Sequence, residues 1–297
     1  MNAILMPTCE PYAPVAAFTR GRLDAWWPAH PDVVVCGLAA PAPALGECLP
    51  LTVDPDDWVG IVQDAVRRLE ERGTEWLYLV LDDHPPFGPC NVDYLNRRLP
   101  EIAAELGAIQ VNLLGWDQHQ PQEGAVLGRR HLFWQRNSPD FRWNFSLHPG
   151  FWHVLTLRRM LESLRSNSPD IRSAREFEGA MPAACRRVDP GLLERTYRVR
   201  GDGFTAGGRW FESRSMRLLT QRLIGPTRLA VRLGWPRRVP TIDAAVLTYH
   251  RYANGPYPMF WSGLVRGRKL HEEALRFLAW TGQSALADDL RRTVRLA

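Results

Sequence analysis

Two carboxylates and an imidazole stand side by side at Asp82, Asp83 and His84. They directly follow residues 76–81, an almost wholly apolar run that predicts a strand covered on both faces. Carboxylate oxygens suit Mg²⁺, and the imidazole favours Mn²⁺. The cluster therefore predicts a divalent-cation site that could clamp a diphosphate and neutralise its charge as it leaves. The alternative is that the acids only cap a turn at a hydrated strand end.

These side chains need a scaffold, and the first half of the chain alternates between apolar runs and helical periodicities. Such alternation predicts an α/β fold with a mostly parallel sheet and flanking helices. In open sheets of this kind, ligands bind beyond the carboxyl ends of the strands. Strands are predicted at 2–6, 33–36, 76–81 and 109–114, and a hairpin or sheet extension is predicted at 131–135 with 141–148. Helices are predicted at 13–26, 54–72, 92–106, 153–165 and 173–181. The helix at 92–106 should have a kink or restart at Pro100.

The composition is that of an ordered globular protein. Of 297 residues, 45% are apolar and 23% charged, which excludes wholesale disorder and allows one large domain or two small ones. The five cysteines form no Cys-x-x-Cys pair, so a disulfide framework and a zinc ribbon are not expected. The start has no basic region before its short apolar stretch, and no run approaches the ~18 apolar residues of a spanning helix. We therefore expect a cytoplasmic protein.

Positive charge is concentrated in the last third of the chain. The net charge is +5, but residues 181–240 carry 13 Arg against 4 acids. This excess indicates an anionic partner, and the absence of a recognisable reading module disfavours nucleic acid. Residues 216–235 form a basic amphipathic stretch, broken at Gly225-Pro226, that is typical of contact with an anionic membrane; packing against the rest of the protein is the alternative.

Five segments, in order, resemble those of bacterial GT-A glycosyltransferases, which use nucleotide-sugar donors. Residues 4–12 are similar to the first strand and donor loop of that family, and 76–84 (WLYLVLDDH) to the strand that ends in its Asp-x-Asp-type metal motif. Residues 145–152 resemble a "SLQPAIW"-like segment, 176–178 an acidic motif, and 263–269 a terminal basic segment. The chain departs from the family at Asp82-Asp83-His84, so either Asp83 or the pair Asp82 and His84 would hold the metal. It also lacks the Trp expected before Phe177.

The resemblance implies a GT-A-like fold with a basic helical C-terminal extension. Residues 1–182 would form the nucleotide-sugar-binding and catalytic domain, and 183–297 would complete the active site and contact the acceptor or a membrane. Glu178 would be the general base of an inverting displacement, with Asp117 in reserve; Glu176 and Glu178 are two apart, so only one should face the pocket. The implied donor-binding residues are Thr8, Asp54 (which could instead cap a helix), Asp82, Arg266 and Lys269, and the implied metal ligands are Asp82, Asp83, His84 and His250.

The expected activity is therefore metal-assisted glycosyl transfer to a hydroxyl acceptor, in surface polysaccharide or lipid-linked glycan assembly. The expected cofactor is Mn²⁺ or Mg²⁺. The expected location is cytoplasmic, with peripheral contact at the inner face of the membrane. Two alternatives stay open: a non-catalytic GT-A-like protein that recruits a membrane or assembly partner, and a nucleotidyltransferase that would release pyrophosphate.

Overall fold

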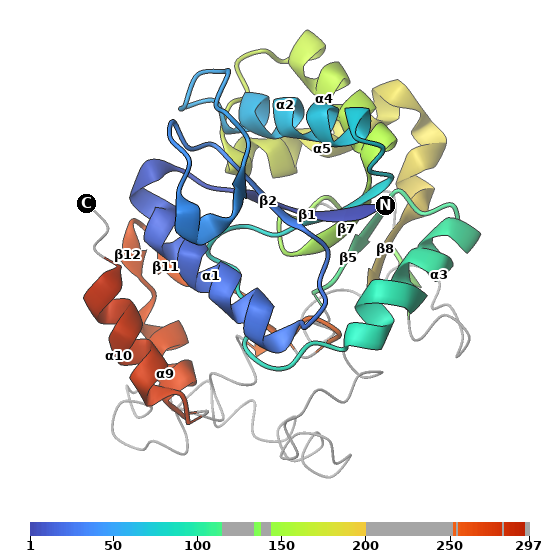
Figure 1. Ribbon diagram of the computed structural model, residues 1–297. Coiled ribbons are helices and arrows are strands. Elements are labelled where there is room, and N and C mark those ends of the chain that lie inside the picture. Colours follow the sequence, from blue (N-terminus) through green and yellow to red (C-terminus); the bar gives the residue numbers. More distant parts are fainter. Residues whose placement is uncertain (115–133, 138–143, 200–251, 254, 281, 295–297) are drawn as a thin grey trace, which may run out of the picture.

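A single sheet with helices on both faces forms the centre of the protein (Figure 1). The computed structural model describes residues 1–114, 134–137, 144–199, 252–253, 255–280 and 282–294. The described residues form an eight-stranded sheet in the order β3-β2-β1-β4-β7-β5-β8-β6. Its strands are β1 (Asn2–Pro7), β2 (Val33–Cys36), β3 (Glu47–Cys48), β4 (Trp76–Leu79), β5 (Gln110–Asn112), β6 (Trp134–Arg136), β7 (Gly150–His153) and β8 (Thr196–Val199).

Most of the strands run in one direction. β1 pairs in parallel with β2 and β4, β2 with β3, and β5 with β8. β7 lies antiparallel between β4 and β5, and β6 is antiparallel to β8. The predicted fold, a mostly parallel sheet with flanking helices, is confirmed. The carboxyl ends of β1, β2, β4, β5 and β8 consequently lie at the same edge of the sheet.

The N-terminal helices form where the sequence predicts them. α1 (Ala13–Trp26) matches its prediction, and α2 (Trp58–Glu71) begins after Asp57, whose carboxylate accepts a hydrogen bond from the Gly60 N–H at 3.0 Å. The predicted irregularity near Pro100 is also present, because a π-helical turn, Tyr94–Arg98, passes directly into α3 (Leu99–Glu105). The proline has no N–H to donate to the preceding turn, and the π-helical turn stands at that place.

Of the two alternatives predicted for residues 131–135 and 141–148, a hairpin or a sheet extension, the described part of the first run extends the sheet, because β6 pairs with β8 at its edge. Residues 131–133 and 138–143 lie outside the described residues. The next described strand is β7, which inserts between β4 and β5. The physical reason is burial: Gly150, Phe151 and Trp152 are buried, and a strand covered on both faces belongs in the interior of a sheet.

Apolar side chains pack on both faces of the sheet. One face is covered by α1, α3 and residues 257–259, and the other by α2, α4 (Val154–Asn167) and α5 (Ala174–Val188). The expected boundary between two domains, at position 182, lies inside α5. The strand β8, which follows α5, belongs to the same sheet as β1 to β7.

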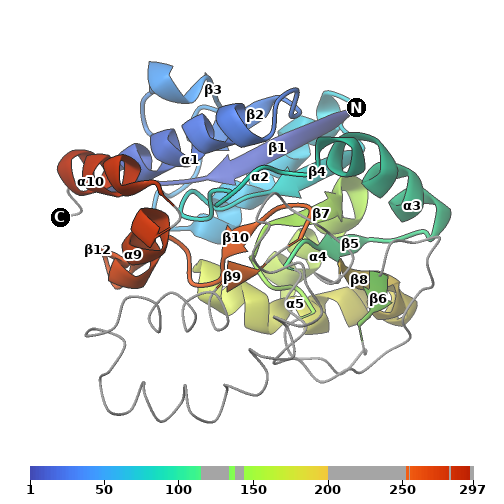
Figure 2. The ribbon, with the colours of Figure 1, turned by 90° about the horizontal axis from the view of Figure 1, so that it is seen from below.

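The C-terminal part of the described chain adds two short strand pairs and two helices. α9 (Glu272–Trp280) and α10 (Ser284–Thr293) pack in a third apolar cluster with Val15 of α1 and Phe87 (Figure 2). The strand pairs are β9 (Tyr252–Ala253) with β10 (Met259–Phe260), and β11 (Val265–Arg266) with β12 (Lys269–Leu270).

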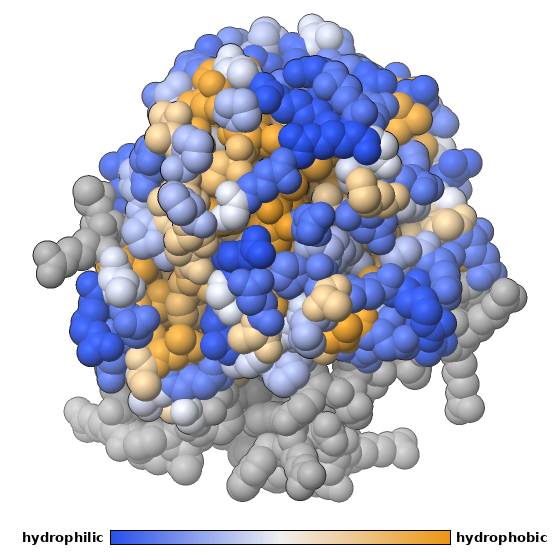
Figure 3. Space-filling view, viewed as in Figure 1, coloured by the Kyte–Doolittle hydropathy of each residue, from blue (hydrophilic) through white to orange (hydrophobic). Residues whose placement is uncertain are grey.

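Polar residues cover much of the surface seen in Figure 3. Met1 is the one large hydrophobic side chain that is exposed among the described residues. No helix in the described ranges is both long and apolar enough to span a membrane.

Candidate active site

Two predicted donor-site residues meet where β1 and β4 end. Because β1 and β4 are parallel neighbours, Thr8 and Asp82 leave the sheet side by side. The Thr8 hydroxyl donates to Asp82 Oδ2 at 2.6 Å, and the Thr8 N–H donates to the Cys36 carbonyl at 2.9 Å. Thr19 of α1 donates its hydroxyl to the Asp82 carbonyl. The Asp82 carboxylate is thereby held at the predicted edge of the sheet.

The C-terminal segment encloses the next two residues. Asp83 Oδ1 lies 2.7 Å from His84 Nδ1. The Leu264 N–H donates to the Asp83 carbonyl at 2.7 Å, and the Tyr257 hydroxyl donates to the His84 carbonyl at 2.8 Å. Gly263 has φ +67°, and a Cβ there would lie 2.5 Å from Asp83 Oδ2, so only glycine permits this approach.

A third set of side chains comes from the segment before β7 and from α5. The Leu147 N–H donates to Glu178 Oε1 at 2.6 Å. The Ser146 hydroxyl is hydrogen-bonded to His148 Nδ1, and His148 Nε2 lies 2.9 Å from the Trp261 carbonyl. The His148 ring centre is 5.4 Å from that of His84, which joins this set to the Asp83–His84 pair.

Of the two acids in the 176–178 motif, only Glu178 faces the site. Glu176 instead completes a capping box, in which the Ser173 N–H donates to its carboxylate at 3.0 Å and its own N–H is bonded to the Ser173 hydroxyl. The two-residue spacing predicts such a division, because side chains two apart on a helix point in different directions.

Burial dominates the electrostatics of the site. It raises the pKa of Asp82 to about 7, with the charge of Asp83 acting in the same direction. It also raises the pKa of Glu178. Burial alone would lower the pKa of His84, but the charge and hydrogen bond of Asp83 outweigh it and the net pKa is raised. The pKa of His148 falls to about 3, through burial and then through the charge of His84.

The predicted metal ligands do not form a complete cage in the part of the chain that the structure describes. Asp82 Oδ2 accepts from Thr8, Asp83 Oδ1 is paired with His84, and no group of three or more His, Cys, Asp or Glu side chains there is arranged to hold an ion. His84 Nδ1 is therefore engaged with a carboxylate rather than free for a metal. His250, the fourth predicted ligand, lies outside the described residues, as does Asp117. Metal binding stays a prediction.

The remaining predicted donor residues lie at two places. Asp54 pairs with Arg172 at 3.0 Å and accepts from the Asp56 N–H at 3.0 Å, close to the start of α2. Arg266 and Lys269 are paired residues on the β11–β12 hairpin and are exposed.

The tip of this hairpin carries a third exposed cation, Arg268. Gly267 and Arg268 have φ values of +59° and +60°, as a two-residue type I′ turn requires. Burial raises the pKa of Cys9 and Tyr12, and the charge of Arg268 acts weakly in the opposite direction on both, so the tip of the hairpin is within electrostatic range of the loop that follows β1.

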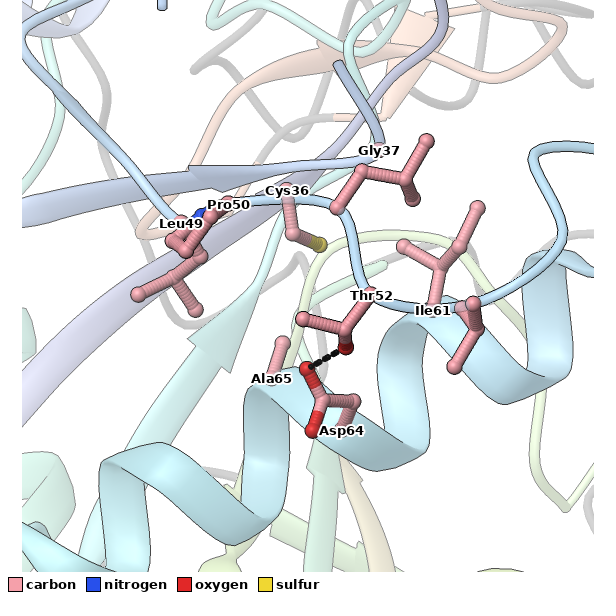
Figure 4. Close-up of a pocket in the computed structure, with 10 residues that line it drawn as sticks. Cys36, Gly37, Leu49, Pro50, Thr52, Ile61, Asp64 and Ala65 are labelled. Atoms are coloured by element: carbon pink, nitrogen blue, oxygen red, sulfur yellow. Dashed lines mark hydrogen bonds between the residues drawn. The ribbon is translucent and has the colours of Figure 1, made fainter. Parts of the chain in front are cut away.

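A small hollow opens at the same edge of the sheet, beside the end of β2 (Figure 4). It is formed by Cys36 and Gly37, by residues 49–53 and by α2, and the Thr52 hydroxyl donates to Asp64 Oδ2 at 2.9 Å on its wall. Gly37 (φ +98°) separates it from the loop after β1, since a Cβ at Gly37 would lie 2.1 Å from the Thr8 carbonyl oxygen.

Sequence reasoning missed Ser146, His148 and Trp261 as site residues. Ser146 and His148 lie inside the "SLQPAIW"-like segment, which is the one available signal for them. Trp261 has no local signal, because its backbone carbonyl rather than its side chain makes the contact with His148.

No protein-family model matches the sequence, and no curated protein matches it. Solved structures with partial similarity include a glycosyltransferase involved in glycosylation of the major capsid of PBCV-1 (12% identity, TM-score 0.38, covering 68% of this chain and 82% of that one). Others are mannose-1-phosphate geranyltransferase from Thermus thermophilus (15%, 0.34, 67% and 73%) and the galactosyltransferase LgtC with donor and acceptor sugar analogues (12%, 0.35, 67% and 86%). Likeness at this level carries no argument about activity.

Proposed function

We propose that the chain is a glycosyltransferase that moves a sugar from a nucleotide-sugar donor to a hydroxyl acceptor. One observation carries the proposal: Thr8 and Asp82 at the ends of β1 and β4, the Asp83–His84 pair, and Glu178 of α5 converge at one edge of a mostly parallel sheet. This is the edge at which open α/β sheets bind ligands. The order of motifs along the sequence supports the same assignment.

The basic hairpin is suited to the donor diphosphate. Arg266, Arg268 and Lys269 are exposed and have no ion pair with any described residue. The charge of Arg268 reaches Cys9 and Tyr12 in the loop after β1, which is the loop assigned to the donor in this proposal. In the proposed reaction, these cations stabilise the negative charge that develops on the leaving nucleoside diphosphate.

Glu178 is suited to activate the acceptor. A carboxylate whose pKa is raised by burial is a stronger base than one in water, and general bases work best when their pKa approaches the working pH. The acceptor hydroxyl would give its proton to Glu178 while its oxygen attacks the anomeric carbon of the donor. The bond from that carbon to the diphosphate oxygen breaks, its electron pair leaves with the nucleoside diphosphate, and the configuration inverts.

We also propose that the enzyme uses a divalent cation, Mn²⁺ or Mg²⁺. If bound by Asp82 and Asp83, it would supply further charge stabilisation to the leaving diphosphate. The acceptor class, a surface polysaccharide or lipid-linked glycan, is a proposal that rests on the resemblance to GT-A glycosyltransferases. A location at the inner face of a membrane is a proposal that rests on the basic composition of residues 181–240.

The first test is a thermal-shift panel of UDP, GDP, CMP and dTDP, with and without Mn²⁺, on the wild type and Asp83→Asn. A ligand that binds only the folded state raises the melting temperature by mass action. We expect one nucleotide to raise it in the wild type, with a smaller shift in Asp83→Asn. Asp288→Asn, which changes an exposed acid of α10, is the matched control and should respond as the wild type does. The absence of any shift would favour a non-catalytic binding protein, and pyrophosphate release from a nucleoside triphosphate would favour a nucleotidyltransferase.

A further inference from the structure

Three segments that are distant in the sequence meet beside Trp261. His148, just before β7, places its Nε2 atom 2.9 Å from the Trp261 carbonyl oxygen, across 113 positions of sequence. His84, after β4, has its ring centre 5.4 Å from that of His148. The His148 and Trp261 rings are stacked, with centres 6.1 Å apart.

The hydrogen-bonding of His148 has one consistent arrangement. A carbonyl oxygen only accepts, so His148 Nε2 must carry the hydrogen that it donates to Trp261. In a neutral imidazole the other nitrogen then accepts, so the Ser146 hydroxyl donates to His148 Nδ1. Ser146 is 5% exposed and its neighbour Leu147 holds Glu178, so His148 is fixed from the side of the proposed base.

The segment that receives this hydrogen bond encloses the donor side of the site. Within residues 256–264, the Tyr257 hydroxyl donates to the His84 carbonyl and the Leu264 N–H to the Asp83 carbonyl. The Pro258 carbonyl accepts from the Phe87 N–H at 2.8 Å. These bonds tie residues 256–264 to the loop after β4, while the bond from His148 ties the same segment to β7 and the loop that contacts Glu178.

We propose that His148 is a positioning residue that holds residues 256–264 against Asp83 and His84, and so sets the donor-side carboxylate relative to Glu178. The catalytic consequence rests on the proposed function, whereas the structural consequence does not. His148 need not touch the substrate; it acts through the Trp261 carbonyl. Without this donor, the segment keeps its bonds to the loop after β4 but loses its link to the β7 side of the site.

The test compares His148→Leu, which has no donor, with His148→Gln, whose amide nitrogen can reach the Trp261 carbonyl. His153→Leu is the matched control. His153 is the last residue of β7 and pairs with Trp76, so it lies at the other end of the strand from His148. The first readout is amide hydrogen exchange of Leu264, whose N–H is bonded to Asp83. The second is the donor KM, the acceptor KM and kcat, measured separately.

We expect His148→Leu to speed exchange of the Leu264 amide by about twofold to tenfold, the factor that corresponds to one net hydrogen bond, and to raise the donor KM by a similar factor. The acceptor KM should change less, and His148→Gln and His153→Leu should resemble the wild type in exchange. Unchanged exchange at Leu264 in His148→Leu would overturn the proposal.

Two further outcomes are decided by the same experiment. If amide exchange in His148→Leu also rises in β4, the fold as a whole has loosened. In that case His148→Asn, whose amide is too short to reach the Trp261 carbonyl, is compared with His148→Gln. Equal exchange at Leu264 in these two variants would overturn the proposal. If the wild type turns over no donor, the proposed function fails, but the exchange at Leu264 still decides the positioning role.

Discussion

Residues of the same type take different roles at this site because their surroundings differ. Glu176 and Glu178 are neighbours on α5, yet one is a solvent-exposed cap and the other a partly buried acid with a raised pKa. Asp82 and Asp83 are adjacent in the chain, yet one is bonded to a hydroxyl and the other to an imidazole. The chemistry is therefore best tested by substitutions that compare such neighbours.

Glu178→Gln should lower kcat by roughly 10²- to 10⁴-fold, the usual contribution of a general base. The fold should persist, because the amide oxygen can still accept from the Leu147 N–H. Steady-state transfer rates with circular dichroism melts check both parts. Glu176→Gln is the control, and it should cost some stability through its cap but leave kcat unchanged; equal rates in the two variants would remove Glu178 from the mechanism.

Arg268→Gly should weaken nucleotide binding without destabilising the protein. A non-glycine residue with φ +60° is strained, so glycine should raise the free energy of unfolding by about 1 kcal/mol. Loss of the cation should at the same time raise the Kd for the donor nucleotide. Urea unfolding and calorimetric titration measure the two effects. Arg268→Lys keeps the charge and should bind nearly as the wild type does; tight binding by Arg268→Gly would show that the hairpin does not contact the diphosphate.

At the scale of elements, the site depends on close approaches between strand ends and loops. The end of β2 packs against the loop after β1, because Gly37 lies against the Thr8 backbone. Thr8 in turn holds Asp82, so a change after β2 reaches the carboxylate after β4 through two contacts.

Gly37→Ala should destabilise the protein more than Gly73→Ala. Both glycines have positive φ (+98° and +78°), so each substitution should cost about 1 kcal/mol from the backbone alone. A Cβ at Gly73 meets nothing within 4 Å, whereas one at Gly37 would overlap the Thr8 carbonyl, which should add about 1–3 kcal/mol. Chemical denaturation of both variants measures the difference, and equal losses would mean that Gly37 and Thr8 are not in contact.

At the scale of the whole molecule, burial couples stability to pH. Burial lowers the pKa of His153, whose surroundings include Glu75 and Arg159. Because its pKa in the folded state lies below the unfolded value near 6.5, the neutral form favours folding. This contribution is present above the unfolded pKa and is lost as the pH falls toward the folded pKa.

The melting temperature of the wild type should therefore fall more steeply between pH 7.5 and 5 than that of His153→Gln. The comparison concerns the slope and not the absolute stability, since His153 also bonds to Thr156 and contacts the Trp76 ring. Melts at constant ionic strength provide the measurement, and parallel curves for the two proteins would contradict the assignment.

Local sequence patterns were sufficient for much of the scaffold. The start of α2 after the acidic run 54–57, the irregularity near Pro100 and the buried strand ahead of Asp82 depend on residues close together in the chain, so they can be predicted from periodicity and end signals. The cap itself is Asp57 and not Asp54, the residue that the sequence offered for that role. The same holds for the position of Asp82 at the carboxyl edge, because parallel strands end on one side.

Tertiary structure decided the rest. The insertion of β7 between β4 and β5, the hydrogen bond between Glu178 and the Leu147 N–H and the contact of His148 with Trp261 join distant segments. Such contacts depend on which buried surfaces fit together and on backbone carbonyls, which every residue carries and no sequence pattern distinguishes. The sequence by itself determined which side chains were available for chemistry at the sheet edge. Only tertiary packing, of β7 and α5 and of the C-terminal segment, determined which of them face one another.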